Sequence, residues 1–290
     1  MRQPQCKPAK FAKGLGDANS RPRLRLGQSC SESNEVESKE VYLNANTGPT
    51  GRLINAISVV AENAPLPTAE LFRESTCVLS FVNSHAVNLA SANATFLELL
   101  LSADVLLRDG VGMSLLYRWI GLDPGRNMNG TDYIPKVLAA ARGARVALYG
   151  SSREVAEAAA HTLRKMGVNV VSARDGFLPI AEYANSVCVD NPRIVVLGMG
   201  MPKQETVAQF LQKAITDPIL IINGGAVLDF LANRFRRAPP ILRRLGLEWL
   251  FRLMLEPRRL WRRYILGNVI FLARAAKLAM QVRFSGTRKP

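Results

Sequence analysis

The chain alternates short apolar runs with helical stretches between residues 76 and 233, and this alternation restricts its fold more than any other feature. Each run has four to seven residues, rich in apolar and β-branched side chains, which is typical of a buried strand. The predicted strands are residues 76–82, 103–107, 145–149, 168–172, 193–197 and 219–222. Strands that alternate with helices of about 10 to 15 residues predict a mostly parallel, twisted α/β sheet with helices on both faces.

Helical patterns occupy several of the connections between these strands. The predicted helices run over residues 86–101, up to residue 119, over residues 153–166 and from Pro202 to about Lys213. Ser151 or Ser152 is the expected cap of the third helix, because a hydroxyl can accept a hydrogen bond from a free backbone N–H of the first turn. Sheets of this class bind ligands at the carboxyl ends of their strands, so the site is expected there.

Composition divides the chain into three segments. Residues 1–50 are polar and poor in large apolar side chains, so we expect a disordered leader. An Arg-rich N-terminus also suits a transit peptide, or a start site assigned too far upstream. The glutamates between residues 32 and 40 argue against a transit peptide. Residues 51–233 form the expected α/β core, and residues 234–290 a basic, amphipathic helical appendage.

The appendage holds nearly all of the chain's excess charge. Its 15 Lys and Arg residues face only Glu248 and Glu256, so it carries +13 of the net charge of +15. Aromatic and aliphatic residues lie between these charges, a pattern that suits anionic phosphate at an apolar boundary. Its longest apolar run, residues 264–272, is shorter than the roughly 20 residues of a spanning helix, so no transmembrane segment is predicted. Because the N-terminus lacks an apolar signal region, we expect a cytoplasmic protein.

Polar residues follow two of the predicted strands. Asp109 comes after the second strand and precedes two glycines, so its carboxylate can accept a proton in the ligand crevice, or it can simply cap a turn. Asn83 and His85 follow the first strand. Asn83 can hydrogen-bond a sugar hydroxyl, and His85 can serve either as a base or in a structural role.

Glycine turns follow three further strands. Gly198 and Gly200 precede Lys203 at a helix start, where the backbone can approach a ligand and the helix N-terminus favours an anion. The same turn also suits a plain strand–helix connection. Lys203 interrupts the GxGxxG spacing, which argues against a dinucleotide fingerprint. The equivalent glycines after the other strands are Gly150, Gly224 and Gly225.

No metal site is predicted. The chain has no Asp-X-Asp pair that would hold a metal on a nucleotide diphosphate. Its four cysteines are widely scattered and form no CxxC pair. If the protein handles a diphosphate, arginines of the appendage can take the place of the metal.

Seven motifs, in this order and spacing, resemble the WecG/TagA/CpsF family, glycosyltransferase family 26, over roughly residues 75 to 275. They are DGVG at 109–112, GTD at 130–132, GMGMPKQE at 198–205, GGAVLDF at 224–230, RAP at 237–239, LEW at 247–249 and EPRRLWRR at 256–263. The resemblance implies a Rossmann-like core and an appendage that completes the active site. It also implies an inverting, metal-independent transfer from a UDP-sugar to a polyprenyl-diphosphate-linked saccharide in bacterial surface or exopolysaccharide synthesis.

The resemblance also implies roles for individual residues. Asp109 becomes the candidate base, Asn83 and Gln204 become substrate contacts, and no cofactor is expected. Three arginines, Arg252, Arg259 and Arg262, are expected to contact the nucleotide diphosphate. The further substrate-binding candidates in the motifs and turns are Gly110, Gly112, Asp132, Gly150, Gly198, Gly200, Lys203, Gly224 and Gly225. Phe81 stands where many members have a threonine, which puts one donor contact in doubt.

The remaining alternatives concern substrate, partner and place. The family uses N-acetylmannosamine, its uronic acid or glucose, and the sequence does not select among them. We expect the protein at the inner face of the cell membrane, and a homo-oligomer stays open. The basic charge also suits nucleic acid, and the sheet suits a nicotinamide-dependent oxidoreductase, but neither class has its motif here, so no nucleic-acid partner is predicted.

Overall fold

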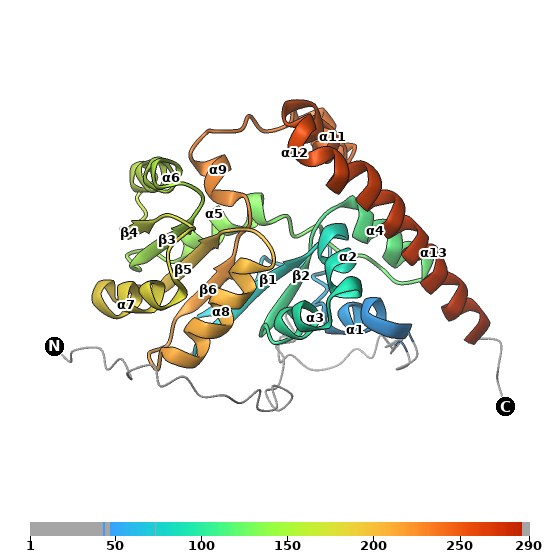
Figure 1. Ribbon diagram of the computed structural model, residues 1–290, viewed down its shortest axis with the longest axis horizontal. Helices are drawn as coiled ribbons and strands as arrows, with labels where there is room; N and C mark the ends of the chain where they lie inside the picture. Colours follow the sequence, from blue (N-terminus) through green and yellow to red (C-terminus); the bar gives the residue numbers. More distant parts are fainter. Residues whose placement is uncertain (1–42, 44–46, 73, 286–290) are drawn as a thin grey trace.

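A computed structural model describes residues 43, 47–72 and 74–285 of the 290-residue chain (Figure 1). Most of the expected leader, residues 1–50, lies outside the described residues, so its disorder stays a prediction. The exception is its end, where helix α1 (Gly48–Ala56) packs buried side chains against the core. Sequence reasoning did not predict this helix.

Six parallel strands form one sheet in the order β2-β1-β6-β5-β3-β4. All six predicted strands are confirmed, with bounds that shift by at most two residues. Their bounds are β1 (Cys77–Val82), β2 (Val105–Arg108), β3 (Val146–Gly150), β4 (Val170–Arg174), β5 (Ile194–Gly198) and β6 (Leu220–Asn223). Nearly every strand residue is buried, because helices cover both faces of the sheet. The predicted α/β fold with a parallel sheet is confirmed.

The helices form two layers around this sheet (Figure 1). One face packs against α1, α2 (Ser84–Ala92), α3 (Ala94–Leu101), α4 (Val111–Trp119), α7 (Ile180–Asp190), α8 (Lys203–Ala214) and α13 (Gly267–Ser285). The other packs against α5 (Gly130–Ala140), α6 (Arg153–Lys165) and α9 (Val227–Leu231). The short turn η3 (Ala69–Leu71) also packs on this second face.

Local sequence explains where these helices begin and end. The helix predicted over residues 86–101 is wrong as a single unit, because Asn93 takes an extended backbone and its side chain accepts a hydrogen bond from Phe96 N at 3.0 Å. Asn93 therefore ends α2 and caps α3. The expected Ser152 cap of α6 is confirmed, since its side chain accepts from the Val155 N–H. Helices α5 and α7 were not predicted.

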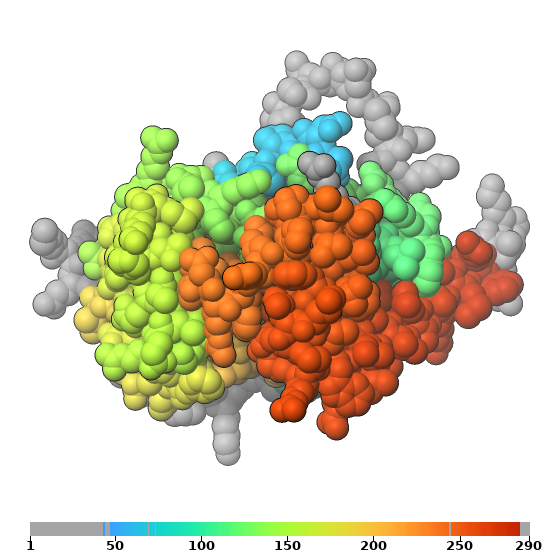
Figure 2. Space-filling model, turned by 90° about the horizontal axis from the view of Figure 1, so that it is seen from above, coloured from blue at the N-terminus to red at the C-terminus, as the bar shows by residue number. Residues whose placement is uncertain are grey.

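The appendage forms a chain of helices across the carboxyl edge of the sheet. It contains α10 (Pro240–Arg244), α11 (Glu248–Leu255), α12 (Pro257–Trp261), the π-helical turn η4 (Arg262–Leu266) and α13. Seen from above, it covers the middle of this face of the molecule (Figure 2). The expected C-terminal helical appendage is therefore confirmed.

Helices α12, η4 and α13 run together over residues 257–284. These 28 residues are long and apolar enough to cross a membrane, and 22% of the most apolar window is buried. The expectation of no such segment compared only the apolar run of residues 264–272 with the length of a spanning helix. The helix continues through Gly267 and Asn268. The expectation was therefore wrong in one respect: by length and composition, the chain does contain a helix that could span a membrane.

One face of α13 docks on the body of the protein. Phe271, Ala275 and Leu278 are buried in the core shared with α2 and α4. Asn88 of α2 donates a hydrogen bond to the Gly267 carbonyl at 2.7 Å, at the first residue of α13. A helix anchored along its length in this way lies against α2 and α4, and its other face stays exposed.

Two phenylalanines of α13 test this docking. Phe271 is 1% exposed and Phe284 is 74% exposed. We expect Phe271→Ala to lower the free energy of unfolding by about 3 to 5 kcal/mol, because it leaves a cavity in the core. Phe284→Ala is the matched control and should change stability by less than about 0.5 kcal/mol. Urea unfolding followed by circular dichroism measures both, and similar losses would contradict the docked arrangement.

Candidate active site

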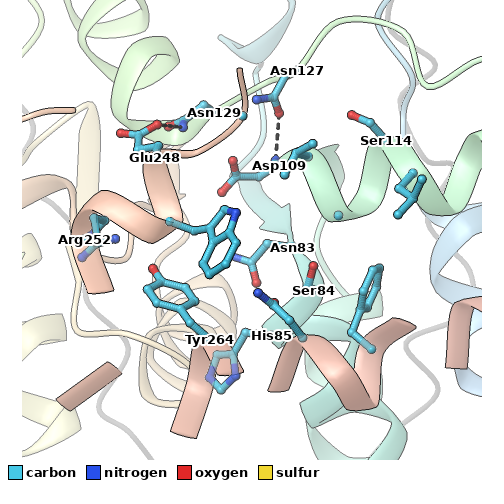
Figure 3. Close-up of a pocket in the computed structure, with 18 of the residues that line it drawn as sticks. Asn83, Ser84, His85, Asp109, Ser114, Asn127, Asn129, Glu248, Arg252 and Tyr264 are labelled. Atoms are coloured by element: carbon cyan, nitrogen blue, oxygen red, sulfur yellow. Dashed lines mark hydrogen bonds between the residues drawn. The ribbon is translucent and has the colours of Figure 1, made fainter. Parts of the chain in front are cut away.

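A cavity of about 500 Å³ lies between the carboxyl ends of β1 and β2 and the appendage. The core contributes residues that follow β1 and β2 together with the start of α5, and the appendage contributes residues of α11, η4 and α13. Figure 3 shows how the labelled side chains converge on this space from elements far apart in the sequence. The site therefore exists only where the appendage meets the core.

Asp109 is held at the centre of the cavity by the backbone on either side of it. Its N–H donates to the Val82 carbonyl at 2.9 Å, which extends the pairing of β2 with β1 by one residue. Gly110 then takes φ +91° and starts α4, a conformation that favours glycine. The Gly110 N–H donates to Asn127 Oδ1 at 2.8 Å. These contacts fix the direction of the Asp109 carboxylate.

Asn83 places a second polar group next to Asp109. Its Oδ1 accepts a hydrogen bond from Ala86 N at 3.0 Å and so caps α2. This leaves the amide NH₂ for Asp109, and that hydrogen bond lowers the pKa of the carboxyl. Sequence reasoning expected Asn83 to contact a sugar hydroxyl. The structure brings it into the cavity and shows that it orients the candidate base.

The pKa of Asp109 is raised to about 6. Burial is the main cause, and the negative charge of Glu248 raises the pKa further. The Asn83 hydrogen bond and the positive charges of Arg263 and Arg108 oppose these effects. A carboxylate of this kind is ionised at neutral pH but binds a proton more tightly than an exposed one, which suits a general base.

Glu248 is a site residue that sequence reasoning missed. It begins α11, lines the cavity, and accepts a hydrogen bond from Asn129 Nδ2 at 3.2 Å (Figure 3). Asn129 Oδ1 meanwhile caps α5 by accepting from Thr131 N at 2.9 Å. Its place in the LEW motif was visible in the sequence, but 139 residues separate it from Asp109, and only the fold shows that they meet.

Three arginines of the appendage, Arg243, Arg252 and Arg263, line the cavity, and only Arg252 was predicted. Arg252 lies over the Phe230 ring, 5.0 Å from its centroid. Burial lowers the pKa of the Arg263 guanidinium. Its Nε is buried and has no hydrogen-bond partner among the described residues. Burial of an unpaired charge costs free energy, so this guanidinium is suited to bind an anion.

The other two predicted arginines lie elsewhere in this structure. Arg259 donates to Glu256 at 2.5 Å, and its side chain is 59% exposed. Arg262 lies over the Trp261 ring on the exposed side of the appendage. Neither residue lines the cavity. Their contact with a diphosphate stays a prediction.

His85 also lines the cavity, as the alternative base from the sequence. Burial lowers its pKa to about 4, and the nearby charge of Arg263 lowers it further in the same direction. The imidazole is therefore neutral at physiological pH. Its position beside an arginine suits hydrogen bonding to a ligand without adding charge.

The glycine turns lie at the same edge of the sheet but outside this cavity. None of Gly150, Gly198, Gly200, Lys203, Gln204, Gly224 and Gly225 lines it. Gln204 is 1% exposed, and its Oε1 accepts from the Gly225 N–H at 3.0 Å, so it ties two turns together. A Cβ on Gly150 would lie 2.3 Å from the Gly198 backbone. Close packing explains Gly150, Gly198 and Gly224, whereas Gly200 and Gly225 have a positive φ that favours glycine. The contact of all seven residues with substrate stays a prediction.

Asp132 holds the appendage on the core. It pairs with Arg237 at 2.7 Å, and Arg243 lies 3.9 Å away. The hydrogen bond from Arg237 is the main reason that the pKa of Asp132 is lowered. Asp132 does not line the cavity, whereas the other motif glycines, Gly110 and Gly112, do. Gly112 is also confined, since an added Cβ would meet Ser84 Oγ at 2.2 Å.

The site thus combines a parallel α/β sheet, a partly buried carboxylate of raised pKa at the carboxyl edge of that sheet, and arginines beside it, which is where sheets of this class bind ligands. The profile of the glycosyl transferase WecG/TagA/CpsF family matches residues 56–284. The chain belongs to this family. The resemblance found in the sequence is thereby confirmed.

Curated relatives are similar over most of their length. The N-acetylglucosaminyldiphosphoundecaprenol N-acetyl-beta-D-mannosaminyltransferases of Staphylococcus aureus strains NCTC 8325 / PS 47 and MRSA252 are two of them. Each is 26% identical over 206 residues, which cover 69% of this chain and 80% of the relative.

The raised pKa of Asp109 has a consequence for stability. The folded protein binds this proton more tightly than the unfolded chain, whose carboxyl has its ordinary pKa of 3.8, so stability falls as pH rises from about 4 to about 6. We expect Asp109→Asn to raise the free energy of unfolding at pH 7.5 by on the order of 1 to 3 kcal/mol, with little difference near pH 4. Urea unfolding at both pH values measures this.

Asp217 provides the control for that measurement. It is an exposed carboxylate outside the cavity, and Asp217→Asn should change stability by less than about 0.5 kcal/mol at either pH. An Asp109→Asn variant that is destabilised equally at both pH values would show that the carboxylate has a structural role instead.

Proposed function

We propose that this protein is an inverting, metal-independent glycosyltransferase that moves a hexosyl residue from a UDP-sugar to a polyprenyl-diphosphate-linked saccharide. The observation that carries the proposal is the Asp109 carboxylate, partly buried in a cavity that Arg252 and Arg263 also line. The family supplies the reaction class. The names of the relatives supply the kind of acceptor.

In the proposed step, Asp109 takes the proton of the acceptor hydroxyl. The hydroxyl oxygen forms a bond to the anomeric carbon while the bond from that carbon to the UDP oxygen breaks, and UDP leaves with the electron pair. A single displacement inverts the anomeric centre, so one base is sufficient. The pKa of about 6 keeps Asp109 ionised at neutral pH while retaining affinity for the proton.

Positive charge near the leaving diphosphate supplies the remaining stabilisation. Arg252 and Arg263 project into the cavity from α11 and η4. Fixed donors in a site shielded from water stabilise developing negative charge more strongly than donors in water do. In this proposal they act in place of a metal, and Arg259 and Arg262 add further charge where the appendage meets the diphosphate.

The turns after β3, β4 and β5 suit the nucleotide. Phe177 follows β4 and is 77% exposed, with Lys203 Nζ 5.9 Å from its ring centroid. An exposed aromatic ring offers a stacking surface for a base. Lys203 also begins α8, and a helix N-terminus favours a phosphate. We place the uridine along this open edge and the sugar toward Asp109.

The proposed sugar is N-acetylmannosamine, with its uronic acid and glucose as alternatives. The relatives are N-acetyl-beta-D-mannosaminyltransferases whose acceptor is N-acetylglucosaminyldiphosphoundecaprenol. An assay of donor hydrolysis over a panel of UDP-sugars distinguishes the three. The proposed product belongs to a bacterial surface polysaccharide or exopolysaccharide.

Transfer to a lipid-linked acceptor tests the role of Asp109. We expect Asp109→Asn to lower kcat by about 10²- to 10⁴-fold, because it removes the general base. In the wild type, kcat/KM should fall as pH drops below about 6, where Asp109 becomes protonated. Wild-type activity should persist in EDTA. Near wild-type turnover of the folded Asn variant would disprove the assignment.

The exposed face of the appendage is the proposed membrane contact. Trp261, Ile265 and Val269 are exposed along this part of the appendage. Arg258 lies exposed beside them. Apolar side chains with a flanking arginine suit the interface of an anionic membrane. This face would bring the cavity to a lipid-linked acceptor at the cytoplasmic surface.

Polar substitution of this face tests the contact. The double variant Ile265→Asn with Val269→Asn should lose most of its binding to anionic vesicles in a flotation assay, because it removes apolar area from the interface. Val189 is 81% exposed on α7, outside the appendage, and Val189→Asn is the matched control. Equal flotation of both variants and the wild type would contradict the proposed contact.

A further inference from the structure

One face of α4 lines the cavity from end to end. Val111, Ser114, Leu115 and Arg118 all border it. Their spacing of three, four and seven residues from Val111 places them in one stripe along the helix. The stripe starts beside Asp109 and ends at Arg118, so the cavity continues from the candidate base along α4.

The start of α13 forms the opposite wall of this stretch. Asn268, Phe271 and Leu272 line the same cavity. Leu272 is 38% exposed and Arg118 at the end of the stripe is exposed as well, so this end of the cavity is open. The wall is apolar apart from Asn268. It lies close to the exposed apolar residues of the appendage that form the proposed membrane contact.

Arg118 is the cation at this open end. No described residue forms an ion pair or a hydrogen bond with its guanidinium. Its side chain is exposed and borders the cavity. An anionic ligand at the mouth of the cavity would give this guanidinium a partner.

We propose that Arg118 binds the diphosphate of the lipid-linked acceptor, between the saccharide at Asp109 and a lipid chain that leaves past Leu115 and Leu272. The seven residues from Val111 to Arg118 span about 10 Å along the helix axis. A single hexose with its anomeric diphosphate covers this length. The inference rests on the proposed function, and it gives the acceptor an anion site separate from Arg252 and Arg263.

Kinetics with two acceptors tests this site. We expect Arg118→Gln to raise the KM of a polyprenyl-diphosphate-linked saccharide about tenfold or more, because a charge-assisted contact is lost. The KM of the UDP-sugar and the KM of an uncharged octyl glycoside of the same saccharide should not change. Arg118→Lys should give an intermediate acceptor KM, since it keeps the charge and loses the bidentate geometry.

Binding of farnesyl diphosphate provides a readout that does not require transfer. Calorimetry should show about tenfold or weaker binding to Arg118→Gln than to the wild type. Arg283→Gln, which removes an exposed arginine from the last turn of α13, should bind like the wild type. If the wild type binds this probe but transfers no sugar, the proposed function fails while the diphosphate site stands.

Three results would overturn the inference. The first is unchanged farnesyl diphosphate binding and acceptor KM in Arg118→Gln. The second is an equal rise in KM for the uncharged glycoside, which would indicate a general distortion of the cavity. The third is a loss of Arg118→Gln flotation on anionic vesicles that is large enough to explain the whole rise in acceptor KM. Arg118 would then be a contact for lipid headgroups.

Discussion

The docking of α13 on α2 and α4 is the interaction on which the site depends. Phe271 is buried between these helices and also lines the cavity, so the same side chain closes the core and forms a wall of the site. Asn88 holds the first residue of α13 through the Gly267 carbonyl. Without this docking, Asp109 would face water, and the main cause of its raised pKa would be lost.

Sequence reasoning predicted the sheet because its signals are local. Each strand is a short apolar run, and each run appears in the structure within two residues of its predicted place. The position of Asp109 also follows from local sequence, since it ends a strand and precedes Gly110. The break at Asn93 was missed because an apolar pattern continues through it, and one capping side chain decides the local backbone.

The partners of Asp109 required the fold. Glu248 and Arg263 lie more than 130 residues away in the sequence, and many arginines surround them. The choice among Arg259, Arg262 and Arg263 depends on how the helix turns at η4, where a π-helical turn changes the direction of successive side chains. Helical spacing cannot predict such a turn. The resemblance indicated Arg259 and Arg262, whose contact with a diphosphate stays a prediction, and the structure adds Arg263 in the cavity.

The appendage is held in two different ways, and this links its position to the chemistry. Helix α13 has a buried apolar face, whereas α11 contributes no buried residue. Near α11, polar contacts therefore connect the appendage to α5, from Glu248 to Asn129 and from Arg237 to Asp132. Because Glu248 is also the charge that raises the pKa of Asp109, the proton affinity of the base depends on the half of the appendage with the weaker packing. Glu248 and Arg252 of the same helix both line the cavity, so the position of α11 sets both the basicity of Asp109 and one of the positive charges beside it.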